Sequence, residues 1–136
     1  MRYIAIFSTV LALALAAGCS SPPAAASGDP ADHISALVVA GHYEDAISAF
    51  LALPPSLNKL SYVRAANAAS LACATIGALE KEPARRKAFF TEAERILPDI
   101  TKGKYMIPAS SEFRKEAEAA QAIARMTIKH LRTKTR

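Results

Sequence analysis

Few residues in this chain combine the types and the spacing that chemistry requires. His33 and His42, with Glu44, lie close enough along the chain to converge on a metal ion, which imidazole and carboxylate groups commonly bind. Polar side chains exposed beside a turn explain the same three residues more simply. We therefore expect no metal site.

Sequence motifs typical of enzymes are also missing. The chain contains no His-Glu-x-x-His, no closely spaced cysteine pair, no Gly-x-Ser-x-Gly and no glycine-rich phosphate loop. The neighbouring carboxylates Glu92/Glu94 and Glu116/Glu118 are two residues apart, so on a helix the members of each pair do not share a face. We predict a protein that is not an enzyme and that uses no cofactor.

The two cysteines have different surroundings. Cys73 lies in an apolar helical stretch, residues 70–76, which is typical of a buried small hydrophobic residue. Cys19 follows an uncharged run from Ile4 to Ala17 that is rich in Ala and Leu. This run is shorter than the about 20 apolar residues that a membrane span needs, and it is typical of the central part of a secretory signal.

The segment Leu15-Ala16-Ala17-Gly18-Cys19 resembles the lipobox of bacterial lipoproteins. In that family the Cys thiol receives a diacylglycerol and a dedicated signal peptidase cuts directly before it. The resemblance implies that residues 1–18 are a signal peptide, that Leu15 to Gly18 are recognised by the peptidase, and that Cys19 is the lipid attachment site.

The same resemblance predicts where the protein is found. Two or more acyl chains anchor a protein stably, so lipid on Cys19 would hold the chain at a membrane. In the lipoprotein family an Asp after the Cys favours retention on the inner membrane, and Ser20 stands there instead. We expect the outer membrane, facing the periplasm, if the source has two membranes. The alternative is an ordinary secretory signal, cut after Gly18 or after residues 24–26.

Residues 19–28 predict a flexible tether, because they are small, include two prolines and carry no charge. From Asp29 to Arg136 the sequence predicts one helical domain with a basic C-terminal tail. Alanine makes up 30 of the 136 residues, tryptophan is absent and β-branched residues are sparse. This composition favours helices over sheets.

Helix caps and helix-breaking residues predict five helices and no strand. Asp29-Pro30 opens the first, Pro54-Pro55 ends the second, and Pro98 follows the fourth. The expected helices are residues 29–41, 43–53, 57–79, 83–97 and 110–132, with a loop at 102–108. On the fifth, an apolar stripe should face the core: Phe113, Ala117, Ala120, Ala124 and Leu131.

The pattern Gly41-x-Tyr43-x-x-Ala46-x-x-x-Phe50 resembles the turn and second helix of a tetratricopeptide repeat. The resemblance implies that the glycine closes one helix, that the small alanine lets two helices approach closely, and that the phenylalanine fills the gap one turn later.

A second segment, which contains Phe90 and Ala93 and is followed by Pro98, resembles the repeat more weakly. Arg86 occupies a position where a small residue is expected, and Phe50 and Phe90 are 40 residues apart rather than about 34. The predicted fold class is all-α, a small helical-hairpin bundle of about five helices with tetratricopeptide-like packing. The alternative is an unrelated bundle of four or five helices.

Charge is distributed unevenly. Residues 19–58 contain four acids and no Lys or Arg, whereas residues 59–136 contain sixteen bases and eight acids. At 100° per residue, four bases fall on one narrow helical stripe: Arg125, Lys129, Arg132 and Arg136. This stripe is a candidate interaction site for anionic lipid, lipopolysaccharide or an acidic partner, and a solvated helix face explains it as well.

Two functions fit these features. The first is a membrane-anchored, non-enzymatic adaptor or assembly factor, of the kind that serves secretion or pilus machinery, which binds another envelope protein. A groove lined by Tyr43, Phe50, Phe89 and Phe90 would favour it. The second is a module in which the basic C-terminal helix binds the envelope or anionic lipid without a dedicated protein client. We expect no nucleic acid ligand for an exported chain.

Overall fold

The computed structural model describes residues 28–136. They form α3 (Pro30–Val39), α4 (Tyr43–Leu51), α5 (Lys59–Leu79), α6 (Pro83–Ile96), the 3-10 helix η1 (Gly103–Tyr105) and α7 (Arg114–Lys134), and no strand occurs among them. The all-α fold class and the small five-helix bundle are thereby confirmed. The predicted lipobox, Leu15 to Cys19, and the tether up to residue 27 lie outside the described residues.

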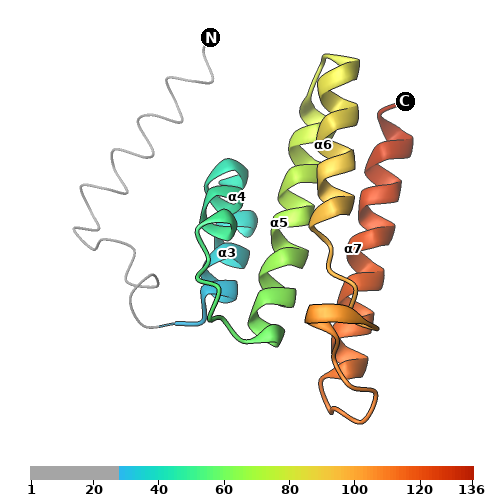
Figure 1. The fold of residues 1–136 in the computed structure, drawn as a ribbon. Coiled ribbons are helices and arrows are strands. Elements are labelled where there is room, and N and C mark those ends of the chain that lie inside the picture. The colour runs from blue at the N-terminus through green and yellow to red at the C-terminus, as the bar shows by residue number, and fades with distance from the viewer. Residues whose placement is uncertain (1–27) are drawn as a thin grey trace, which may run out of the picture.

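The bundle is built around α5 (Figure 1). The hairpin of α3 and α4 packs on one side of this helix and α6 and α7 pack on the other, so that α5 contacts all four of the other α-helices. Helices α6 and α7 contact each other much less than either of them contacts α5. Their weak mutual contact leaves a hollow between them.

The first helix begins where its cap predicts. The Asp29 side chain accepts a hydrogen bond from the Ala31 N–H at 2.9 Å, and Pro30 occupies a first-turn position that needs no N–H donor. The helix closes before Gly41, whose φ of +83° is a left-handed conformation that glycine adopts without strain.

The second helix of the hairpin brings its small and aromatic residues to the core. Ala46 is fully buried and Phe50 is 8% exposed, as the Gly-x-Tyr-x-x-Ala pattern implies. The helix ends at Leu51, two residues before the expected end at Leu53. The helix ends early because the Leu53 N–H donates a hydrogen bond to the Phe50 carbonyl, which forms a turn before the two prolines.

Helix α5 is buried on several sides because its residues are small. It starts at Lys59 rather than Leu57, since the Asn58 side chain caps it by accepting a hydrogen bond from the Ser61 N–H at 2.9 Å. Near its other end Gly77 lies against α6: a Cβ placed there would be 3.0 Å from the Cβ of Phe89. The missing side chain therefore permits the close approach of the two helices.

The segment between α6 and α7 is fastened to α5 and to the start of α7. Tyr105 of η1 stacks on Tyr62 of α5, with ring centroids 4.2 Å apart and an interplanar angle of 3°. Arg114 donates hydrogen bonds to the carbonyls of Ile100 and Ile107. Because this segment is held in turns up to Phe113, α7 begins at Arg114 and not near Ser110.

The expected apolar stripe of α7 is partly wrong. Ala117 and Ala124 are buried and Leu131 is half-buried, but Phe113 is 43% exposed and Ala120 is exposed. Two residues left out of that stripe, Gln121 and Ile128, are buried in their place. The late start of the helix leaves Phe113 outside it, and the side chain of Gln121 can be buried because it donates a hydrogen bond to the Pro98 carbonyl at 2.7 Å.

Candidate functional site

The four bases of the predicted stripe lie together along one hollow between α6 and α7. This hollow has a volume of about 550 Å³ and is lined by Arg125, Lys129, Arg132 and Arg136 of α7 and its C-terminal end, together with Glu94, Leu97 and Thr133. The four bases that share a helical face in the sequence therefore line the same hollow.

A second hollow of about 540 Å³ adjoins the first and shares Glu94, Arg132 and Arg136 with it. Toward the start of α6 it is lined by Arg86, Lys87 and Phe90, among others. We call the two hollows together the basic groove. Among residues 28–136, six bases line it, Arg86, Lys87, Arg125, Lys129, Arg132 and Arg136, and Glu94 is the only acid that does so.

Arg132 is held by contacts with two residues of α6. Its guanidinium lies 2.7 Å from a carboxylate oxygen of Glu94 and 5.6 Å from the ring centroid of Phe90, which is 2% exposed. The ion pair joins α7 to α6, and the Phe90 ring makes a cation–π contact with the same guanidinium. Arg132 is thus held at the centre of the groove.

Arg86 joins the ends of three helices. Its guanidinium donates hydrogen bonds to the carbonyls of Glu80 at 3.1 Å and Thr135 at 2.6 Å, which cap the C-termini of α5 and α7. Carbonyls at helix C-termini carry partial negative charge and favour a cation. In the sequence, Arg86 is notable only as a departure from the repeat pattern, because nothing in the sequence shows which helix ends meet at this residue.

The other four bases of the basic groove are free of partners among residues 28–136: Lys87, Arg125, Lys129 and Arg136 are exposed and make no ion pair there. Asp99 lies near the outer edge. Hydrogen bonds from Thr101 hold the pKa of the Asp99 carboxyl below its ordinary value, and the charges of Lys102 and Arg125 act in the same direction. Within residues 28–136, Lys87, Lys129 and Arg136 therefore present positive charge that no ion pair neutralises, whereas the charge of Arg125 lies near that of Asp99.

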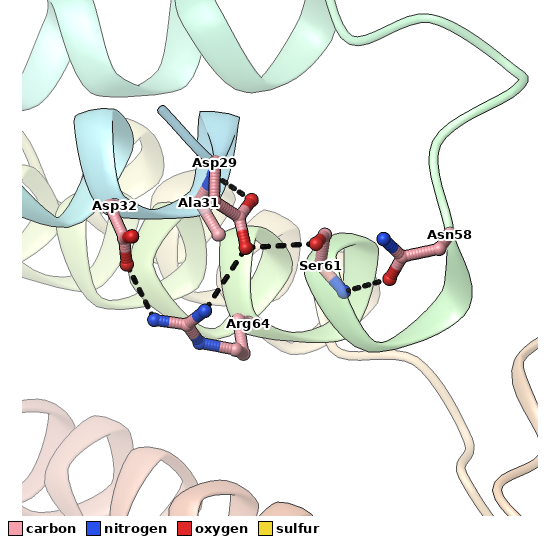
Figure 2. A network of polar contacts seen from close by, with 6 residues as sticks. All are labelled: Asp29, Ala31, Asp32, Asn58, Ser61 and Arg64. Carbon is pink, nitrogen blue, oxygen red and sulfur yellow. Dashed lines mark hydrogen bonds and ion pairs between the residues drawn. The ribbon is translucent and has the colours of Figure 1, made fainter. Parts of the chain in front are cut away.

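A cluster at the opposite end of α5 was missed by the sequence analysis apart from its helix cap (Figure 2). Asp29 accepts hydrogen bonds from the Ser61 hydroxyl at 2.9 Å and from Arg64 at 3.1 Å, and Arg64 also pairs with Asp32. These contacts join residues more than thirty positions apart, so no local pattern indicates them. They fasten the start of α3 to the start of α5.

The four aromatic residues proposed to line one groove are not brought together. Tyr43 and Phe50 lie on α4, whereas Phe89 and Phe90 lie on α6, on the other side of α5 (Figure 1). Phe90 alone of the four contributes to the basic groove, as its floor. The described residues therefore do not form the aromatic groove that would have favoured an adaptor, because α5 lies between α4 and α6.

The remaining candidate groups are placed as follows. Cys73 is 2% exposed, and burial, with a smaller effect of the Glu92 charge, raises the pKa of its thiol to about 11.

Within residues 28–136 no three His, Cys, Asp or Glu side chains, including His33, His42 and Glu44, approach closely enough to hold a metal ion. Glu92 pairs with Arg95 and Glu94 with Arg132, so these two carboxylates serve different partners.

The chain matches no protein-family model, and neither a curated protein nor a solved structure is significantly similar to it. None of the helices within residues 28–136 is long and apolar enough to span a bilayer.

Proposed function

We propose that this chain is a membrane-anchored envelope lipoprotein that acts as a non-enzymatic adaptor or assembly factor and binds another envelope protein through the basic groove. The anchor in this proposal is lipid on Cys19, which follows from the lipobox resemblance of Leu15 to Cys19. The observation that carries the binding role is the concave surface lined by six bases and one acid.

The side chains of the groove support binding rather than catalysis. Arginine stays protonated in proteins, so it donates hydrogen bonds but does not exchange protons near neutral pH. Lysine and arginine side chains attract anions and orient them, and a hollow between two helices gives a partner more contact than a flat surface does. Secretion or pilus machinery in the envelope is one setting in which such adaptors work.

The test is site-specific photo-crosslinking in the envelope of the source cells. A photoreactive residue replaces Lys87 or Lys129 in the basic groove, and in control chains it replaces Lys59 or Lys115, which are exposed elsewhere. We expect one envelope protein, identified by mass spectrometry, to be crosslinked from the two groove positions and from neither control. Equal crosslinking from all four positions, or none from the groove, would contradict the proposal.

A further inference from the structure

We infer that the ligand of the basic groove is an acidic polypeptide segment, rich in Asp and Glu, and that it is bound at the end of the fold opposite Asp29, which follows the proposed anchor in the chain. This inference rests on the proposed function and names the chemistry of the partner. It follows from the charge of the groove, from its position relative to the anchor, and from the pairing of Arg132 with Glu94.

The charge of the groove selects carboxylates. Six bases face one acid along its walls, and only Arg86 and Arg132 have partners that hold them. Of the remaining bases, Lys87 lies on α6, whereas Arg125, Lys129 and Arg136 lie on α7 or at its C-terminal end. Arginine binds carboxylates through two parallel hydrogen bonds, so a segment with several carboxylates can engage both walls at once.

The position of the groove favours a protein over lipid headgroups. Its outer hollow begins at Pro83, just beyond the C-terminal end of α5, whereas the chain enters the fold at Asp29, beside the N-terminal end of α5 (Figure 1). Helix α5 has 21 residues, which corresponds to about 30 Å. When α5 points away from the membrane, this hollow lies well beyond the Debye length of about 8 Å at physiological salt, over which headgroup charge acts.

Glu94 occupies the place that a carboxylate of the partner would take. It is 2.7 Å from Arg132, its side chain is 53% exposed, and it belongs to both hollows. An incoming carboxylate has to displace Glu94 or share the guanidinium with it. Replacing Glu94 by glutamine removes the competing charge while preserving the size of the side chain.

The test measures binding of a fluorescent peptide of alternating Glu and Ser to the full chain in an uncharged detergent, by fluorescence anisotropy. The same peptide with Gln in place of Glu is the comparison. We expect the Glu peptide alone to bind, with an affinity that falls when NaCl is raised from about 50 to about 300 mM. The E94Q variant should bind it several-fold more tightly, because Arg132 is then free.

A matched pair of variants separates the groove from overall charge. Arg125→Glu with Lys129→Glu reverses two exposed groove bases, and Lys59→Glu with Lys115→Glu makes the same charge change at exposed positions outside it. The groove variant should lose about tenfold or more in affinity and the control variant should lose little. Equal losses, or equal binding of the Gln peptide, would overturn the inference.

A further measurement tests whether the chain binds vesicles that contain the anionic lipid phosphatidylglycerol. If vesicle binding depends on Arg125 and Lys129 while the Glu peptide does not bind, the groove recognises headgroups and the inference is wrong. If the Glu peptide fails to bind while groove crosslinking in the envelope persists, the adaptor role stands and only the acidic chemistry of the partner is overturned.

Discussion

Asp29 performs three tasks with one carboxylate. One oxygen accepts the Ala31 N–H and caps α3, while the other accepts hydrogen bonds from Ser61 and Arg64 of α5. The first task is visible in the sequence, since Asp followed by Pro is typical of a helix start. The others depend on the packing of α3 against α5. At the scale of single residues, capping could be predicted from the sequence but tertiary hydrogen bonding could not.

Replacing Asp29 by alanine should lower the free energy of unfolding of the full chain by about 1–2 kcal/mol, because the cap and the bonds to α5 are lost together. Urea denaturation followed by circular dichroism measures this change. Asp45→Ala is the control: Asp45 is exposed and approaches only His42, at 3.7 Å, so its loss should change stability by less than about 0.5 kcal/mol. Similar effects of the two substitutions would contradict the role of Asp29.

The helices themselves were largely predictable, and the errors have local causes. Asp29-Pro30, Pro54-Pro55 and Pro83 are strong boundary signals, and the helices lie where these signals place them. The start of α7 was misplaced because Arg114 holds the preceding loop through the carbonyls of Ile100 and Ile107, a contact with no sequence signature.

The buried face of α7 also depends on tertiary contacts that the sequence does not show. A pattern of apolar residues cannot identify Gln121 as a core residue, because its burial depends on the Pro98 carbonyl of a distant loop. The stripe of bases was easier to predict than the core face. Arg125 and Lys129 need only the helical period to share a side, whereas the second wall of the groove, on α6, requires the tertiary structure.

The close contact between α5 and α6 predicts how a larger side chain at Gly77 affects stability. Gly77→Val places branched atoms where even a Cβ would be 3.0 Å from the Cβ of Phe89, so α5 and α6 must move apart. We expect the free energy of unfolding to fall by about 1–3 kcal/mol, the range for overpacked contacts. A thermal melt of the full chain tests this expectation, with Ala119→Val on the exposed side of α7 as the control for valine in a helix. Equal melting temperatures in the two variants would show that the contact is loose.

At the scale of the whole molecule, the separation of charge follows the separation of the helices. The acids of residues 29–58 lie on α3 and α4, on one side of α5, and the basic groove lies on the other side, between α6 and α7. The uneven charge was visible in the sequence. Its consequence, a basic hollow at the far end of α5 from Asp29, depends on how the helices pack.

The proposed anchor is tested by Cys19→Ser, which removes the thiol that would receive the lipid. We expect labelling of the protein with a tritiated fatty acid to disappear, and the variant to remain as uncleaved precursor or to leave the membrane fraction. Ser20→Ala serves as the matched control, because it changes the neighbouring hydroxyl and keeps the thiol. Normal labelling and membrane retention of Cys19→Ser would show that the chain is not a lipoprotein.

The bonds made by Asp29 also determine how the fold bears mechanical load. A pull on the chain at Gly28 acts first on Asp29, which is fastened to Ser61 and Arg64 of the central helix as well as to the first turn of α3. Helix α3 therefore cannot unwind from its free end until these three hydrogen bonds break. If the terminus is anchored as proposed, tension would be passed to α5, the element that every other α-helix within residues 28–136 packs against. The proposed partner in the basic groove would pull on the same helix from its opposite end.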